Sequence, residues 1–203
     1  RYYDGADPDD IWAVKSAGID PSNGKELFYA KDGSYTYDFS YDDEVVCGNT
    51  RPDVEGVIGS SLNWKGFSVS LNFRYQMGAD VFNEALYSKV ENISRSDLNK
   101  NQDKRALYER WQEEGDIVRF KNIASAETTP MSSRFVQEEN VLTLESVYLG
   151  YEFYDGWIKK LGLSSLKFQV SMRDVFRAST IRSERGISYP FARSMEAGLS
   201  FNF

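Results

Sequence analysis

The sequence predicts an all-β chain built from antiparallel strands of a transmembrane β-barrel, and three observations lead to this fold class. Apolar and polar residues alternate along several segments of residues 54–203, as they do on strands whose two faces meet different surroundings. These segments are longer than the roughly five or six residues usual for strands of globular proteins. Short and long connections alternate between them, which is typical of outer-membrane barrels.

The alternation predicts five strands. Three are regular, because the apolar period runs from Phe67 to Met77 and recurs from Leu166 and from Met195. Weaker alternation marks residues 54–64 and 141–153, and a tilted strand of about 9–11 residues is long enough to cross a bilayer. The side chains expected to face lipid are Phe67, Val69, Leu71, Phe73, Phe168, Val170, Met172, Leu199 and Phe201, and those expected to face the lumen are Asn72, Arg74, Gln169, Arg173, Glu196 and Asn202.

The connections divide the chain into strands and loops. Only Lys65-Gly66 separates the first two strands, which predicts a two-residue hairpin with glycine at positive φ. Residues 154–165 form a second short link, whereas residues 79–140 and 176–190 form longer ones. We therefore expect residues 1–53 to be an extracellular loop and hairpin region, and residues 54–203 to be C-terminal barrel strands with extracellular loops 79–140 and 176–190.

The longer inserts are expected to contain short helices. Residues 80–90 carry apolar side chains at helical spacing. Residues 103–114 place Leu107 and Trp111 on one helical face, and Gly115 is expected to end that helix. In the turn-rich first quarter of the chain, strand-like pieces are expected at residues 12–17 and 26–30.

Composition excludes several classes of function. The chain has 31 acidic and 24 basic residues, a net charge of −7 and no basic block, which argues against nucleic-acid binding. Histidine is absent and cysteine occurs once, which excludes histidine-based catalysis and an internal disulfide. Acidic turns offer no carboxylate pair with a catalytic spacing, so no enzyme and no cofactor are expected. The acidic turns are expected to be solvated. The alternative is that their carboxylates bind Ca²⁺.

Several segments resemble the C-terminal part of SusC/RagA-type TonB-dependent transporters of Bacteroidetes outer membranes. In family order, the segments that carry the resemblance are residues 16–26 (SAGIDPSNGKE), 66–68 (GFS), 110–116 (RWQEEGD), 133–136 (SRFV), 147–151 (VYLGY) and 189–193 (YPFAR), followed by the terminal Phe203. Glu114 departs from the pattern, because the family commonly has proline before Gly-Asp. The resemblance extends through nearly the whole chain.

The resemblance implies a 22-stranded barrel in the bacterial outer membrane that encloses an N-terminal plug and is energised by TonB. It also implies a SusD-like surface lipoprotein that delivers glycans or peptides. The plug, the TonB contact and the remaining strands are expected to precede Arg1, so the strands of this chain must pair with the rest of the barrel. Phe203 resembles the aromatic C-terminal assembly signal of such barrels, which places that end in the periplasm and the long loops outside the cell.

Aromatic residues in the long loops are the candidate contacts with substrate or partner. Tyr35 and Tyr37 alternate with Ser and Asp, a pattern that suits stacking on sugars or docking of a protein. Trp12 and Trp111 complete the candidate set. The alternative for the tyrosines is a hairpin packed on neighbouring loops. For the lone Cys47, simple packing is expected.

Two other classes of function remain open at this stage. A soluble β-sandwich module that binds polysaccharide would also be all-β, although long strands and alternating loop lengths favour the barrel. A passive porin would share the fold, and only the segments that resemble the transporter family argue against it. The sequence does not identify the transported solute.

Overall fold

The computed structural model describes residues 3–97, 99–125, 127–154, 156–182 and 193–203, which form two compact units. The strand unit comprises residues 53–78, 140–180 and 185–203, as far as these are described, and the loop unit comprises residues 1–52, 79–139 and 181–184. Within the described residues, no helix has the length and apolar character needed to cross a membrane.

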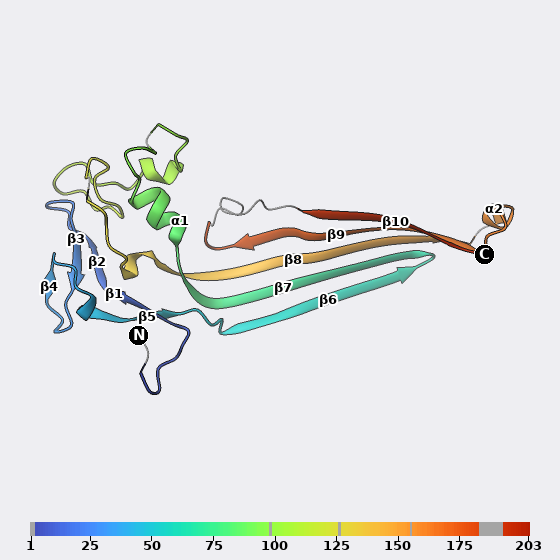
Figure 1. The fold of residues 1–203 in the computed structure, drawn as a ribbon, viewed down its shortest axis with the longest axis horizontal. Coiled ribbons are helices and arrows are strands. Elements are labelled where there is room, and N and C mark those ends of the chain that lie inside the picture. Colours follow the sequence, from blue (N-terminus) through green and yellow to red (C-terminus); the bar gives the residue numbers. More distant parts are fainter. Residues whose placement is uncertain (1–2, 98, 126, 155, 183–192) are drawn as a thin grey trace. The chain divides into compact units, whose positions relative to one another are not determined.

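The strand unit is built around a five-stranded sheet with the order β10-β9-β8-β7-β6, so that neighbours in sequence are neighbours in space (Figure 1). The expected first strand is confirmed at both limits. The next three strands extend further than the alternation predicted because pairing continues beyond the apolar segments, whereas the last strand ends at Asn202, one residue before the expected Phe203. The bounds are β6 Val54–Trp64, β7 Phe67–Phe82, β8 Val136–Phe153, β9 Ser165–Ser179 and β10 Ser194–Asn202. Residues 191–192 and most of the expected loop 176–190 lie outside the described residues.

The register of the sheet separates an apolar face from a polar face. Antiparallel pairing places Leu199 opposite Phe168, which in turn lies opposite Tyr151. On the other face, Gln169 lies between Gly198 and Gly150 in the same way. Because side chains directly opposite in a ladder share a face, the segregation read from each strand continues from one strand to the next.

The apolar face carries large exposed side chains. Leu62 is 63% exposed, Phe168 44% and Leu199 59%. A soluble protein rarely leaves so extended an apolar surface in water. In the described part of the chain, β6 and β10 are the two edges of the sheet and do not pair with each other, so the five strands do not close into a small soluble barrel.

The Lys65-Gly66 turn joins β6 to β7 as expected. Both residues have positive φ, 46° at Lys65 and 88° at Gly66, as a two-residue hairpin requires. A Cβ added to Gly66 would lie 2.5 Å from the Glu152 carbonyl oxygen, and the Gly66 carbonyl accepts a 2.9 Å hydrogen bond from the Glu152 amide. This glycine is therefore required both by the turn and by the close approach of the next hairpin.

Aromatic residues gather at this end of the sheet. Phe67 packs on Tyr151 with 4.3 Å between ring centroids, and Phe153 contacts both Tyr151 and Trp157 edge to face. The Lys65 ammonium lies 5.0 Å from the Trp64 ring. Trp157 belongs to a short helix, α2 (Gly156–Lys159), in the link between β8 and β9. The arrangement fits an interfacial aromatic belt.

The loop unit contains two small sheets. β1 pairs with β5, and β3 lies between β2 and β4. β3 falls within the expected strand-like piece at residues 26–30, whereas the expected piece at residues 12–17 is divided between the end of β1 and the start of β2, and β5 was not expected. Their bounds are β1 Asp10–Val14, β2 Ser16–Ile19, β3 Glu26–Tyr29, β4 Tyr35–Thr36 and β5 Glu44–Asn49, with a 3₁₀ turn at Tyr41–Asp43 before β5.

The expected helix at residues 80–90 begins later than predicted. β7 continues through Phe82, and Asn83 then caps α1 (Glu84–Leu86) by accepting a 3.0 Å hydrogen bond from the Leu86 amide. A single π-helical turn, Tyr87–Glu91, completes the helix. The helix begins late because residues 80–82, which fit the helical spacing, also continue the alternation of β7 and pair as part of that strand.

The expected helix at residues 103–114 is wrong. Only Lys104–Leu107 is helical, as a 3₁₀ turn capped by Asp103. Leu107 is 69% exposed, so the face expected to be apolar is not buried, and Glu109 has a φ of +56°, which interrupts helical geometry. A further 3₁₀ turn, Ser133–Phe135, leads directly into β8.

An apolar core holds the loop unit together. Phe135 and Val90 are fully buried, and Phe82 and Tyr87 pack their rings around Phe135. The core joins the helix after β7 to the turn before β8, so the long insert is a folded structure and not an open loop. Its buried members are Leu86, Val90, Ala106, Phe120 and Phe135.

Candidate functional site

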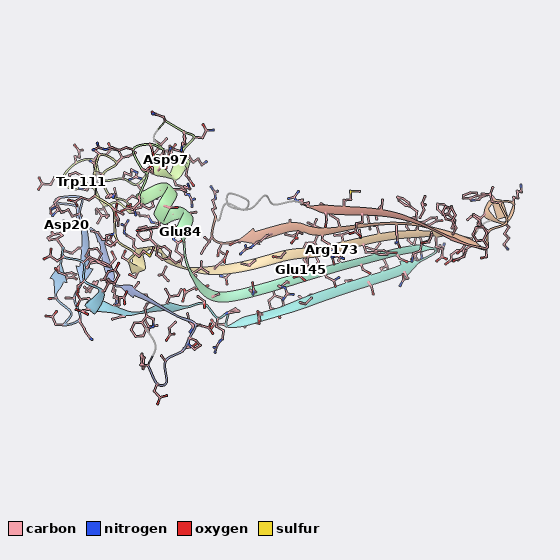
Figure 2. All side chains as sticks on the ribbon, in the orientation of Figure 1. Asp20, Glu84, Asp97, Trp111, Glu145 and Arg173 are labelled. Atoms are coloured by element: carbon pink, nitrogen blue, oxygen red, sulfur yellow. The ribbon has the colours of Figure 1, made fainter. Side chains whose placement is uncertain are left out.

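The turn at residues 20–24 is held between two of the predicted contact residues, Tyr37 and Trp111. The indole Nε1 of Trp111 donates a 2.9 Å hydrogen bond to the Pro21 carbonyl. Gly24 is buried with a φ of +71°, and a Cβ added there would lie 2.5 Å from Trp111 Cδ2. The indole therefore packs directly on the backbone at Gly24, where there is no side chain. Figure 2 shows Trp111 beside Asp20 in the loop unit.

Tyr37 anchors the same turn through Asp20. Its hydroxyl donates to Asp20 Oδ2 and accepts a 3.1 Å hydrogen bond from Asn23 Nδ2. Asp20 Oδ1 also accepts from the Ser22 amide at 2.8 Å. These donors, the Tyr37 hydroxyl first, hold the pKa of Asp20 below its ordinary 3.8, because they favour the ionised carboxylate.

The other predicted residues are placed separately. Tyr35 in β4 packs on Tyr29 at 5.0 Å between ring centroids and remains 62% exposed. Trp12 in β1 is half-buried and contacts Tyr3 edge to face. Phe203 follows the last strand and is 93% exposed. The structure thus brings Tyr37 and Trp111 together and leaves the roles of all five residues as predictions.

A buried charge network joins Arg134 to Glu26 and Glu91, and it was not expected from the sequence. Arg134 is 11% exposed at its side chain, and its Nη2 donates to Glu26 Oε2 at 2.9 Å and to Glu91 Oε1 at 2.7 Å. Ser132 Oγ donates to Glu26 Oε1 at 2.5 Å. Despite the desolvation, the two carboxylates raise the pKa of Arg134, so the guanidinium remains charged.

Arg110 fixes the backbone around the network. Its guanidinium donates to the carbonyl oxygens of Ala106 at 2.5 Å, Lys121 at 3.0 Å and Val90. Buried backbone acceptors that are not paired in a sheet or helix need such donors. Arg110 therefore replaces the backbone pairing that this irregular segment lacks.

Two pockets lie beside the network within the loop unit. One has a volume of about 320 Å³ and is lined in part by Phe28, Tyr37 and Phe39. The other has a volume of about 470 Å³ and is lined in part by Arg110. Both reach Glu91, Lys121, Ser125, Glu127 and Thr128.

The polar face of the sheet carries its own interactions. Arg74 Nε donates to Glu145 Oε1 at 2.5 Å, and Asn72 Nδ2 donates to Ser146 Oγ at 2.9 Å. Figure 2 labels Glu145 on this sheet. Arg173 lies opposite Ser146 on the next strand. Polar side chains that bond to one another across strands suit a water-filled lumen lining.

The acidic clusters and the cysteine have ordinary partners. Arg51 forms ion pairs with Asp7 at 3.4 Å and Asp9 at 2.8 Å. Within the described residues, no group of three or more Cys, Asp or Glu side chains is arranged to hold a metal ion. Cys47 is half-buried with its thiol directed at the Ala13 carbonyl at 3.4 Å, and burial raises its pKa.

No local sequence pattern predicts the Glu26–Arg134–Glu91 network, because its members lie far apart in the chain. Glu26 and Arg134 both belong to segments of the family resemblance, and Ser133 of the same segment accepts a 3.0 Å hydrogen bond from the Ser16 amide. These segments, distant in sequence, therefore meet in one folded unit.

Sequence comparison finds relatives among outer-membrane receptors, although no family model matches the chain. TonB-dependent receptor P39 of Formosa agariphila is 24% identical over 171 residues, which cover 82% of this chain and 16% of the relative. TonB-dependent receptor P3 of the same organism is 23% identical over 221 residues, covering 99% of this chain and 21% of the relative.

This chain is similar in sequence to part of these TonB-dependent receptors. It spans about a fifth of the length of the relatives it matches. The resemblance to TonB-dependent outer-membrane proteins that the sequence predicts is confirmed by these relatives, which are receptors and not enzymes.

Solved structures of the RagAB peptide transporter share the fold. The RagAB peptide transporter has a TM-score of 0.76 with 18% identity, covering 96% of this chain and 23% of that chain. The RagAB peptide importer in its open-open state has a TM-score of 0.73 with 19% identity, covering 96% and 22%. Since these structures are barrel transporters, the β-barrel fold class is supported, whereas the number of strands in the whole barrel stays a prediction.

Proposed function

We propose that this chain supplies barrel wall and extracellular loops to a TonB-dependent importer that takes up glycans or peptides with a SusD-like surface lipoprotein. The observation that carries the proposal is the exposed apolar face continued in register over neighbouring strands. Such a face requires lipid or another apolar covering. The alternative of a soluble polysaccharide-binding module leaves this face without an explanation.

The edges of the sheet support the need for further strands. Among the described residues, β6 and β10 each have one edge that pairs with no other strand, and lipid provides no hydrogen bonds for the backbone groups along these edges. In the whole protein, these edges are expected to pair with other strands of the same barrel, which the resemblance puts at 22. The plug and the contact with TonB belong to that remaining part.

The loop unit is proposed as the docking region for the lipoprotein and as part of the substrate vestibule. Long ordered loops commonly carry binding function. The exposed Tyr35 and the pair formed by Tyr37 and Trp111 are the proposed contacts, and Trp12 is a fourth. The aromatic Phe203 is proposed as part of the barrel-assembly signal.

The experiment that tests the proposal uses the full-length protein. It is expected in the outer-membrane fraction, to need detergent for extraction and to migrate faster on gels before boiling than after boiling. A photo-crosslinking residue at Tyr35 is expected to capture a surface lipoprotein in intact cells, whereas the same residue at Lys160, in the link between β8 and β9, is not. A protein that is soluble without detergent contradicts the barrel assignment.

A further inference from the structure

The end of the sheet that carries the Lys65-Gly66 turn combines exposed indole rings with exposed lysines. Trp64 is 61% exposed and Trp157 is 48% exposed. Trp64 directly precedes Lys65, and Trp157 is followed by Lys159 and Lys160 in the link between β8 and β9. All three lysines are exposed. Tryptophan and lysine are residues that membrane proteins place at the boundary between hydrocarbon and headgroups.

Trp157 continues the apolar face of the sheet. Its ring packs edge to face on Phe153 with 5.6 Å between centroids, and Phe153 packs in the same way on Tyr151 at 4.5 Å. Tyr151 lies opposite Phe168 in the ladder, so this row of rings is continuous with the face proposed to meet hydrocarbon. The indole therefore marks the end of that face.

The link between β8 and β9 is folded and still exposes an apolar side chain. Ile158 is fully buried, and its carbonyl accepts hydrogen bonds from the amides of Leu161 at 2.9 Å and Leu163 at 3.3 Å. Leu161 is nevertheless exposed, and Figure 1 shows α2 at the end of the strands. Exposed tryptophan and leucine next to lysine are typical of segments that lie in a membrane interface. The exposed side chains form a rim at this end of the sheet: Trp64, Lys65, Trp157, Lys159, Lys160 and Leu161.

The rim is basic, although the chain as a whole is acidic. The net charge of the chain is −7, yet residues 61–68 and 156–168 contain four lysines and no Asp or Glu. Lys167 belongs to the polar face, where it lies opposite Glu152. The three lysines of the rim, set against Asp155 in the same link, leave a net charge of +2. A local excess of lysine attracts an anionic surface.

Lys65 shows how a lysine of the rim is positioned. Its ammonium lies 5.0 Å from the centroid of the Trp64 ring. Trp64 lies on the apolar face, opposite Phe67 in the ladder. The positive charge is therefore held at the end of the face proposed to meet lipid chains, which is the depth at which a phospholipid carries its phosphate.

An anionic headgroup fits this charge better than a zwitterionic one. Lysine is a point charge with three N–H donors, which suits phosphate oxygens. A choline headgroup brings a second cation that the lysines repel, whereas a glycerol headgroup leaves the charge of the phosphate uncompensated. Each lysine of the rim therefore favours a lipid with a net negative charge.

We propose that the rim binds the headgroup of an anionic phospholipid. Its lysines interact with the phosphate, while its two tryptophans and Leu161 pack on the glycerol backbone and the first methylene groups of the chains. The proposal rests on the proposed function, because it requires the apolar face to lie in a bilayer, and it adds selectivity for lipid charge at one end of the barrel.

The test uses full-length protein extracted in detergent, freed of lipid and checked for faster migration on unboiled gels. Native mass spectrometry then compares the binding of phosphatidylglycerol and phosphatidylcholine with identical acyl chains, added in equal amounts. Phosphatidylglycerol is expected to bind about tenfold more tightly. This preference is expected to decrease as the concentration of ammonium acetate rises, because salt screens exposed charges.

Variants of exposed lysines locate the preference. Lys159→Gln combined with Lys160→Gln is expected to reduce it about fivefold and to leave the binding of phosphatidylcholine unchanged. Lys65→Asn, in a different hairpin, is expected to reduce it about twofold, and asparagine tolerates the positive φ of this position. Lys31→Gln combined with Lys104→Gln is the matched control, because it removes two exposed lysines from the loop unit, and it is expected to bind like the wild-type protein.

Three results would overturn the proposal: equal binding of the two lipids, a preference that is unchanged in both rim variants, or an equal loss in the loop-unit control. If the protein migrates as a folded barrel and one of these results is obtained, only the lipid site fails. If the protein is not extracted as a barrel, the proposed function itself fails.

Discussion

Arg134 donates a 2.9 Å hydrogen bond to the carboxylate of Glu26, a residue 108 positions earlier in the chain. The same guanidinium reaches Glu91 at 2.7 Å, so one side chain connects β3, the helix after β7 and the turn before β8. Because all three side chains are nearly buried, the pairs are weakly screened by water, and removal of the cation leaves two carboxylates uncompensated.

Arg134→Met is therefore expected to destabilise the loop unit by about 3–5 kcal/mol, the cost of breaking a buried ion pair from one side. In full-length protein, amide exchange is expected to accelerate at residues 84–91 and 26–29, while the strands of the sheet keep their protection. Arg119→Met is the control, because Arg119 is 60% exposed and its pair with Glu109 is long at 3.6 Å. Equal effects of the two variants would contradict a structural role for the buried network.

Gly24→Ala tests the contact between Trp111 and the turn at residues 20–24. Positive φ costs alanine about 1–2 kcal/mol, and overlap with the indole adds about 1–3 kcal/mol. Gly33→Ala is a matched control, because Gly33 has a φ of +86° but nothing within 4 Å of an added Cβ. We expect Gly24→Ala to increase amide exchange around residues 20–24 clearly more than Gly33→Ala increases it around residue 33. Comparable increases in the two variants would show that Trp111 does not restrain the turn.

The alternation of side chains was sufficient to predict which residues share a face of each strand, because each face meets one kind of environment along the whole strand. Residues 54–64 matched the observed β6 within both limits. The loop unit was less predictable. Trp111 was assigned to a helix, yet its partner is the Pro21 carbonyl, 90 residues away, and helical spacing carries no information about such a contact. The Arg134 network escaped prediction for the same reason.

Val170→Arg tests the assignment of the apolar face. Val170 lies opposite Ala197 on β10 and Leu149 on β8, in the middle of the paired region. If this face meets hydrocarbon, an arginine near the midplane is expected to cost about 2–4 kcal/mol. The urea midpoint for refolding of the full-length protein into lipid vesicles measures this cost.

Gln169→Arg is the control for that measurement, because Gln169 lies on the opposite face, next in sequence to Val170. A change confined to the polar face is expected to be tolerated far better, since water solvates the guanidinium there. If Val170→Arg refolds with an unchanged midpoint, the apolar face is not in contact with lipid.

The pKa of Asp20 predicts an acid-sensitive turn. A carboxylate whose pKa is lower in the folded state stabilises that state above the unfolded value, 3.8, and loses the contribution as pH falls through the folded value. The turn is therefore expected to be ordered at neutral pH and to loosen below pH 3.8. Pepsin cleavage within residues 19–29, normalised to an unfolded substrate at each pH, reports this change.

Tyr37→Phe removes the largest contribution to the lowered pKa of Asp20, so its turn is expected to become sensitive to pepsin at a higher pH than the wild-type turn. Tyr35→Phe serves as control, because the hydroxyl of Tyr35 lies beside Tyr29 and not beside Asp20. Identical pH profiles for Tyr37→Phe and the wild-type protein would rule out this hydrogen bond as the cause.

The direction of the chain through the membrane follows from the pairing of its strands. Trp64 pairs with Phe67, Phe153 with Leu166, and Asn202 with Ser165, so the Lys65-Gly66 turn, residues 154–165 and Phe203 share one end of the sheet. If that end lies in the periplasm, as the family resemblance implies, residues 1–53 and 79–140 are expected to face outward.

Single cysteines in a Cys47→Ser background test this orientation in intact cells. A membrane-impermeant maleimide is expected to label Ser34→Cys, in the exposed turn before β4, without lysis. Lys160→Cys, exposed in the link between β8 and β9, is expected to be labelled only after the outer membrane is opened. The reverse labelling pattern would show that the barrel has the opposite orientation. Tyr35, Tyr37 and Trp111 would then be out of reach of a surface lipoprotein, because a partner outside the cell contacts only the loops that emerge there.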